Sequence, residues 1–282
     1  MKFLIFNHHP DCLLYMYKGL SSLGHEVEVA SEKLTLNVFG YSSTKGSMLE
    51  LADQLIEPLD YSEEFNGLTF VDELNHDYYI SIRPEVSKLF GWRAWFDCQL
   101  QGELMHKYGA GIKTCNHPNA ESMGFQWVGN WVPKQGTMQK KKYITQLMTL
   151  PSLSADTAYL TRLAQKNPDL IKMPQLGNFI RDKDILPETA LLVHNKPTGI
   201  NCYAVCKALD MGIPVYMSSK IKSHIGFDDL PNELFFFAEQ YSIEEAYEKS
   251  LESDSQSIQS TYRSIYTLER LQEHLRNIIN GL

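Results

Sequence analysis

The start of the chain constrains its fold most, because a buried strand, an amphipathic helix and a second strand follow one another directly. Residues 2–6 form a short apolar run, and residues 12–23 carry apolar side chains at helical spacing. Gly24 stands where a helix-terminating glycine belongs, and residues 25–30 alternate with period two, as a strand does. This pattern predicts the opening βαβ unit of a doubly wound parallel sheet.

The second half of the chain repeats this pattern. Residues 190–194 are typical of a buried strand, and residues 195–199 form a loop that contains proline and glycine. A helix is predicted over residues 201–211, and Gly212 ends it before the next strand at residues 213–217. The sequence therefore predicts a second α/β unit.

The length of the chain favours two domains. At 282 residues it is long for one ordinary domain and suits two of about 100–150 residues each. Apolar residues make up 43% and charged residues 21%, so a sizeable core can be buried. We expect one Rossmann-like domain at 1–135 and a second at 136–257. A C-terminal helix at 258–282 is expected to pack back toward the first domain.

Composition also limits where the protein works. The first apolar run is far shorter than a signal-peptide core or the roughly 20 residues of a membrane span, and no later segment is apolar for long enough either. Five cysteines are scattered without a CxxC pair, which fits reduced thiols in a cytosol. We expect a cytoplasmic protein with no membrane partner. The sequence does not specify an oligomeric state.

Three segments carry a family resemblance. Residues 190–217 resemble the donor-binding motif of GT-B glycosyltransferases, and residues 3–10 with 24–27 resemble the first strand, substrate loop and second strand of the same superfamily. Residues 258–279 resemble its C-terminal crossover helix. The resemblance implies an α/β fold with two Rossmann-like domains, whose parallel sheets face a central cleft that holds a nucleotide sugar. The donor is expected to be UDP-linked, and no metal or other cofactor is expected.

The donor site is expected where strand ends and a helix N-terminus meet, since backbone N–H groups and the helix dipole attract a diphosphate there. Lys207 occupies the position at which many family members carry a ribose-binding carboxylate, and Gly199 replaces a second landmark eight residues earlier. Lys207 is interpreted either as a phosphate contact or as a solvated helix residue. The candidate donor-binding residues are Arg181, His194, Lys196, Thr198, Gly199, Asn201, Cys202 and Lys207.

The loop after the first strand is the candidate catalytic site. An imidazole of near-neutral pKa at His9, or at His8, could accept a proton from an acceptor hydroxyl, as a histidine does in several inverting relatives. Asp11 is close enough in sequence to orient that ring, although it also suits a helix cap. Asn7 is a candidate acceptor-binding residue. The alternative is a structural, hydrogen-bonded histidine pair.

The tryptophans divide into two groups. Trp92 and Trp95 are three residues apart on a helix predicted over residues 85–107, which indicates core packing. Trp127 and Trp131 flank a glycine loop and are candidates for stacking against an acceptor. Core packing remains an equal alternative for this second pair.

Charge is distributed unevenly along the chain. The net charge of −8 opposes non-specific nucleic-acid binding, and residues 50–77 contain nine acids and no Lys or Arg. Residues 123–155 contain no acid but carry Lys134, Lys140, Lys141 and Lys142. These lysines are interpreted either as solvated side chains or as a site for a polyanion.

The specific hypothesis for the acceptor is 5-hydroxymethylcytosine in double-stranded DNA. The chain is similar in its short length to phage-encoded glycosyltransferases that decorate their own DNA with glucose or arabinose, which would place it in the cytoplasm of a host cell. Two alternatives stay open. One is a saccharide or lipid-linked acceptor, and the other is a non-catalytic nucleotide-binding module on a degenerate GT-B fold.

Overall fold

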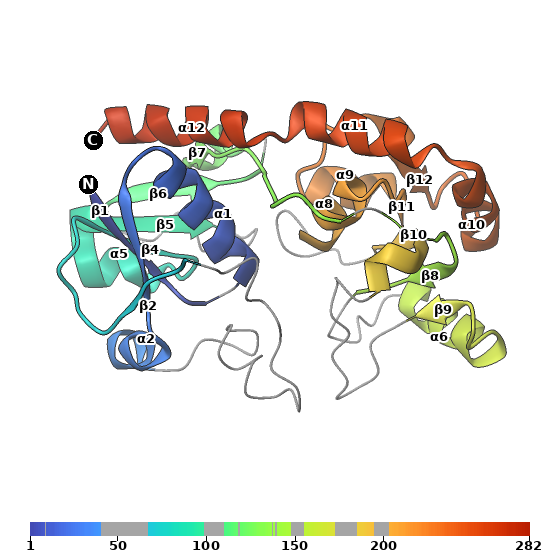
Figure 1. The fold of residues 1–282 in the computed structure, drawn as a ribbon, viewed down its shortest axis with the longest axis horizontal. Coiled ribbons are helices and arrows are strands. Elements are labelled where there is room, and N and C mark those ends of the chain that lie inside the picture. Colours follow the sequence, from blue (N-terminus) through green and yellow to red (C-terminus); the bar gives the residue numbers. More distant parts are fainter. Residues whose placement is uncertain are drawn as a thin grey trace. The chain divides into compact units, whose positions relative to one another are not determined.

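The computed structural model describes residues 1–8, 10–40, 67–98, 110–117, 119–136, 138, 140–147, 155–172, 185–194 and 203–282. The chain divides into two compact units (Figure 1). Unit 1 contains Met1–Pro133 and Leu268–Leu282, and unit 2 contains Lys134–Thr267.

Unit 1 is built on a parallel sheet. Within the described residues the sheet has seven strands in the order β3-β2-β1-β4-β5-β6-β7, and every pairing is parallel. The strands are β1 (Lys2–Phe6), β2 (Glu26–Ala30), β3 (Phe70–Val71), β4 (Tyr78–Ser81), β5 (Ala94–Cys98), β6 (Ile112–Cys115) and β7 (Gln126–Trp127). The predicted opening strand, helix and second strand are confirmed as β1, α1 (Pro10–Ser22) and β2.

Helices cover both faces of this sheet, which is why its central strands are buried and mostly apolar. Phe6 contacts Phe39 at the end of α2 (Glu32–Phe39) and Phe90 at the end of α5 (Glu85–Phe90), with ring centroids 4.9 and 5.8 Å apart. On α1, Gly19 lets α12 (Leu268–Asn280) approach so closely that an added Cβ would lie 2.4 Å from Leu275 Cδ1 (Figure 1). Short 3-10 helices lie at Gly91–Arg93 and Glu121–Met123.

Unit 2 has a smaller parallel sheet. Its described strands follow the order β12-β11-β10-β8-β9, and all pairings are parallel. The strands are β8 (Tyr143–Thr145), β9 (Ile171–Lys172), β10 (Thr189–Val193), β11 (Val215–Met217) and β12 (Phe235–Phe237). The helices are α6 (Ala155–Lys166), α8 (Tyr203–Asp210), α9 (Ser219–His224), α10 (Ile243–Glu252) and α11 (Ser255–Ile265), with 3-10 helices at Leu186–Glu188 and Asn232–Leu234.

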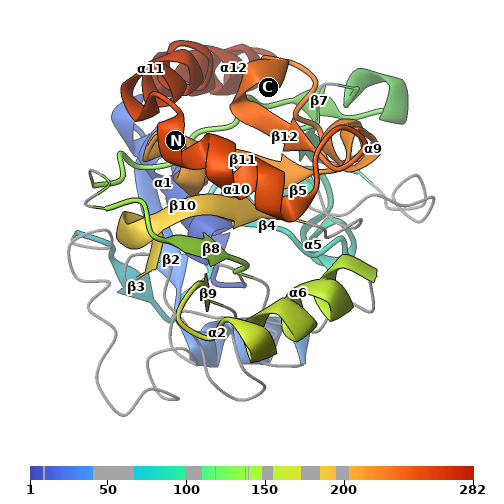
Figure 2. The ribbon, with the colours of Figure 1, turned by 90° about the vertical axis from the view of Figure 1, so that its right-hand side faces the viewer.

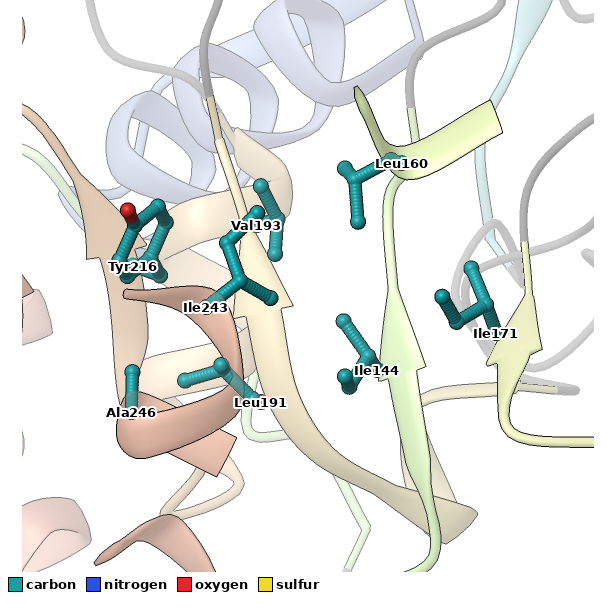
Figure 3. Packing of buried hydrophobic residues seen from close by; sticks show 8 residues of the cluster. All are labelled: Ile144, Leu160, Ile171, Leu191, Val193, Tyr216, Ile243 and Ala246. Carbon is teal, nitrogen blue, oxygen red and sulfur yellow. The ribbon is translucent and has the colours of Figure 1, made fainter. Parts of the chain in front are cut away.

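Alternate residues of β10 form the centre of the unit 2 core. Leu191 and Val193 point to one face, where α6 supplies Leu160 and α10 supplies Ile243 and Ala246 (Figure 3). Figure 2 shows α10 lying in front of β10 and β11 on this face. The predicted strand, helix and strand of this region are confirmed as β10, α8 and β11.

Two predicted helices differ from the structure. The helix expected over residues 85–107 ends at Phe90, because Gly91 adopts a φ of +59° and residues 94–98 continue as the buried strand β5. Trp95 is fully buried in that strand, as expected of a core residue, but Trp92 is 70% exposed, so the core role predicted for Trp92 was wrong. A short apolar run has the same composition in a buried strand and in a buried helix.

The single helix predicted over residues 258–279 was also wrong. The chain leaves the helical conformation at Tyr266, whose φ and ψ are −103° and 81°, and this break separates α11 from α12. The Tyr266 hydroxyl donates to Asp229 Oδ1 at 2.5 Å, which ties the end of α11 to unit 2. α12 begins at Leu268 and belongs to unit 1.

Candidate functional site

Each sheet contains one point at which the strand order reverses. In unit 1 this point lies between β1 and β4, and in unit 2 it lies between β8 and β10. Open α/β sheets bind ligands outside the carboxyl ends of the strands at such points. The first residues beyond these strand ends are Asn7 and His8 after β1, Ile82 and Arg83 after β4, Gln146 after β8 and His194 after β10.

His8 lies in an apolar setting at the carboxyl end of β1. It is 1% exposed, and its ring is edge-on to Phe39 with centroids 4.8 Å apart. Neither ring nitrogen has a hydrogen-bond partner among the described residues. Burial lowers the pKa of His8 to about 3, and the positive charge of Arg83 adds to this shift. The imidazole is therefore neutral at physiological pH.

Asn7, which precedes His8 in the chain, is buried as well. It is also 1% exposed, and within the described part of the chain neither amide atom finds a hydrogen-bond partner. Such atoms are rare in folded proteins, where the great majority of buried polar side-chain atoms are paired. His9 lies outside the described residues, as does the side chain of Asp11, although Asp11 falls within α1. Of the four residues expected at this loop, the structure thus describes the side chains of Asn7 and His8.

A second buried polar group in unit 1 was missed by the sequence analysis. Asp97 on β5 accepts hydrogen bonds from the hydroxyls of Tyr15 at 2.5 Å and Thr114 at 2.8 Å, and all three residues are at most 1% exposed. Burial, together with the negative charge of Asp97, raises the pKa of Tyr15 well above its usual value. Asp97 also lines a small cavity with Ser81 and Cys12. A lone acid within the apolar run of residues 94–98 was the available signal.

Of the expected donor residues in unit 2, the structure describes His194 and Lys207. His194 is 3% exposed after β10, and Gln146, which was not among the expected residues, is 2% exposed after the adjacent strand β8. Lys207 is half-buried in the last turn of α8. The other expected donor residues, Arg181, Lys196, Thr198, Gly199, Asn201 and Cys202, lie outside the described residues.

The carboxyl end of α8 is held by Asp210. Its side chain accepts from Arg263 Nε at 2.7 Å, from Arg263 Nη2 at 3.0 Å and from the backbone N–H of Gln135 at 2.6 Å. Gln259 Nε2 donates to the Asp210 carbonyl at 2.5 Å. Because Asp210 is 3% exposed, this paired network fixes α8 firmly against α11.

The candidate acceptor-binding tryptophans differ in their surroundings. The ring of Trp127 lies 4.7 Å from that of His274 on α12, and the guanidinium of Arg270 lies 4.7 Å from the Trp127 centroid. The backbone N–H of Gly129 donates to His274 Nδ1 at 2.7 Å. Trp127 therefore packs against α12 within unit 1, and Trp131 is half-buried.

The lysines of the acid-free stretch are not equivalent. Lys141 Nζ donates to the carbonyl oxygens of Ser250 and Ser253 at the end of α10, and burial lowers its pKa. A cation at this position stabilises the helix C-terminus. Lys140 and Lys142 are exposed, and Lys142 Nζ donates to the hydroxyl of the adjacent Tyr143 at 2.8 Å.

In the part of the chain that the structure describes, no helix has both the length and the apolar character needed to cross a lipid bilayer. Within the same part of the chain, no three His, Cys, Asp or Glu side chains gather in an arrangement that could hold a metal ion.

Comparison with known proteins rests on structure alone, since no protein-family model matches the sequence and no curated protein is similar to it. The structure is similar to that of HepE from Anabaena in complex with UDP-glucose, with a TM-score of 0.58 and 10% identity over the whole of both chains. It is similar to the lipopolysaccharide outer core galactosyltransferase WaaB, with a TM-score of 0.53 and 12% identity over 100% of this chain and 99% of that one. It is also similar to AviGT4, a glycosyltransferase of avilamycin A biosynthesis, with a TM-score of 0.52 and 10% identity over 100% of this chain and 99% of AviGT4. The chain therefore has the α/β fold of the GT-B glycosyltransferases, with parallel sheets in two Rossmann-like domains.

Proposed function

We propose that the protein transfers a sugar from a uridine-diphosphate sugar to a hydroxyl group of an acceptor, without a metal ion. The observation that carries this proposal is the GT-B fold, combined with buried polar side chains at both points of strand-order reversal. Asn7 and His8 occupy that position in unit 1, and Gln146 and His194 occupy it in unit 2. HepE, which has the same fold, binds UDP-glucose.

The donor is assigned to unit 2. The diphosphate is expected at the N-terminal end of α8, because the N–H groups and the dipole of a helix favour negative charge at that end. The expected cations of this site are Lys207 on α8 and two residues outside the described part of the chain, Arg181 and Lys196. Such groups stabilise the charge that grows on the diphosphate as the glycosidic bond breaks, which is the role a metal ion has in other transferases.

Thermal unfolding in the presence of UDP, UDP-glucose, GDP and ADP tests the donor assignment. A ligand present at 100 times its dissociation constant stabilises the native state by about 2.7 kcal/mol, so the matching nucleotide should raise the Tm by several degrees. If none of the four nucleotides raises the Tm, the proposal is wrong. Binding without release of UDP in the presence of acceptors would instead identify a non-catalytic nucleotide-binding module.

Lys207 gives a finer test of the donor site. If its ammonium group contacts phosphate, Lys207→Ala should weaken UDP binding by about ten-fold, the effect of losing one charge-assisted hydrogen bond, and leave uridine binding unchanged. Lys220→Ala is the matched control, because Lys220 is an exposed lysine on the neighbouring helix α9. Equal effects of the two changes would place Lys207 in solvent.

Two acceptor classes are compatible with this activity. The sequence analysis favoured hydroxymethylcytosine in DNA, which the exposed cations Lys134, Lys140 and Lys142 could help to bind. The alternative is a saccharide or lipid-linked acceptor. Transfer of radiolabelled glucose or arabinose to hydroxymethylated duplex DNA, unmodified DNA and neutral saccharides separates these classes directly.

A further inference from the structure

The four polar side-chain atoms of Asn7 and His8 are the starting point for a further inference. Asn7 Oδ1 and Nδ2 and His8 Nδ1 and Nε2 are all buried, and none has a hydrogen-bond partner among the described residues. Burying such atoms unpaired is costly, so a site that keeps them gains when a ligand pairs with them. Their place beyond the carboxyl end of β1, at the reversal of strand order, is where this fold class binds ligands.

The chemistry of these groups determines which ligand fits. A neutral imidazole has one donor and one acceptor nitrogen, and an amide has both an N–H donor and a carbonyl acceptor. A hydroxyl group both donates and accepts, so neighbouring hydroxyls can satisfy the whole set. A phosphate group offers mainly acceptors, so its negatively charged oxygens would face Asn7 Oδ1 and the acceptor nitrogen of His8.

We propose that Asn7 and His8 form an uncharged hydrogen-bonding site for the hydroxyl groups of a neutral polyol, in which His8 binds the ligand and is not the general base. This inference rests on the proposed function in one respect only, which is that the bound polyol is the sugar acceptor. The ring of Phe39, at the end of α2, lies 4.8 Å from the His8 ring and forms one apolar side of this site.

The aromatic surroundings explain why His8 is a poor base. The rings of Phe6 and Phe39 lie 6.3 and 4.8 Å from the His8 ring. The positive charge of Arg83 further disfavours the protonated form of His8, which would also be positive. The resulting pKa of about 3 for His8 lies well below the near-neutral value that suits general-base catalysis. His8 can therefore position a hydroxyl by hydrogen bonding, but it accepts a proton weakly.

An NMR titration of the protein labelled at its nine histidines tests the charge state of His8 without any assay of sugar transfer. The His8 signals are assigned from their loss in His8→Gln. We expect the His8 ring to stay neutral down to about pH 4, whereas an ordinary histidine titrates near 6.5. A midpoint between about pH 6 and 7 for His8 would overturn the inference.

The same spectra test the ligand class with three probes: glucose, glycerol and inorganic phosphate. Glucose and glycerol should shift the His8 signals in a saturable way, and phosphate should not. By calorimetry, which needs no His8 signal, His8→Phe should abolish saturable polyol binding because its ring has no nitrogens, while His25→Phe, at a half-buried histidine elsewhere in unit 1, should leave it unchanged. Saturation by phosphate, or by neither polyol, overturns the assignment.

Kinetics separate a binding residue from a base. His8→Phe should raise KM for the polyol acceptor more than it lowers kcat, and His8→Gln, which keeps an uncharged donor and acceptor, should partly restore KM. Loss of a general base would instead lower kcat by about 10²–10⁴-fold in both variants, which would overturn the inference. The donor assignment is tested separately by the shift in Tm with UDP. A protein that binds polyols at His8 but binds no UDP would refute the proposed function and leave this inference standing.

Discussion

Replacing Gly212 by alanine tests how closely α11 packs against the end of α8. Gly212 has a φ of +80°, and an added Cβ would lie 2.2 Å from the carbonyl oxygen of Ser255, the first residue of α11. A left-handed conformation costs other residues about 1–2 kcal/mol, and forcing packed atoms apart costs about 1–3 kcal/mol more. Gly212→Ala should therefore lower the free energy of unfolding by about 2–5 kcal/mol.

Gly24 provides the matched control in the same kind of position. It also follows a helix and precedes a strand, its φ is +83°, and its N–H donates to the carbonyl three residues earlier, as that of Gly212 does. Nothing lies within 4 Å of its added Cβ, so Gly24→Ala should cost only the conformational part, about 1–2 kcal/mol.

The two units can unfold separately, so the assay must report on each of them. Urea unfolding followed by circular dichroism gives the total loss, and hydrogen exchange locates it. In Gly212→Ala the amides of α8 and α11 should exchange faster, and in Gly24→Ala those of α1 and β2 should do so. Equal losses in the two variants would show that Ser255 moves away freely, which would refute the argument from close packing.

Three further predictions concern charged and titratable groups. Lys141→Gln should lower the free energy of unfolding by about 1–2 kcal/mol, because the carbonyls at the end of α10 lose their cation. Lys140→Gln, at an exposed lysine, should change this free energy little, and urea unfolding compares the two variants. The folded-state pKa of His8 lies below its unfolded value, so its contribution to stability is present above about pH 6.5 and is lost as the pH falls. The free energy of unfolding should therefore fall by about 2 kcal/mol less between pH 7 and pH 5 in His8→Gln than in the parent, as measured by unfolding at the two pH values. If DNA is the acceptor, changing Lys134, Lys140 and Lys142 together to Gln should reduce the slope of log affinity against log salt by about one for each lost phosphate contact, without altering stability. An unchanged slope would leave these lysines as solvated surface.

The parts of the fold that the sequence predicted correctly are those with local signals. β1 and β10 are short apolar runs because helices bury both faces of their sheets, and both runs end where polar residues begin. Gly24 and Gly212 end α1 and α8 in left-handed conformations that glycine adopts without strain. These signals lie within a few residues of the element they define.

The errors arose where distant residues decide the structure. Residues 94–98 form a strand because β4 and β6 pair with them, and helical spacing between Trp92 and Trp95 carried no information about those partners. The break between α11 and α12 depends on the contact of Tyr266 with Asp229, 37 residues away. Local periodicity cannot report either effect.

For the candidate site, sequence predicted position better than chemical state. It placed Asn7 and His8 correctly at the carboxyl end of the first strand, because that end is set by a local change from apolar to polar residues. The low basicity of His8 depends on Phe39 and Arg83, which are far away in sequence. The helix-capping role of Lys141 likewise depends on Ser250 and Ser253, more than 100 residues later.

The two strand edges also differ in the charge that their proposed ligands require. A departing diphosphate gains negative charge, and the sequence offers Arg181, Lys196 and Lys207 as candidate cations for the donor site. A neutral hydroxyl needs groups that donate and accept without a charge, which Asn7 and His8 provide. In a chain of net charge −8, a neutral acceptor also avoids the repulsion that a polyanionic acceptor would meet. The proton of the acceptor hydroxyl must then pass to a group other than His8. Because burial keeps His8 neutral, we expect the pH–rate profile to show no ionisation near pH 6.5.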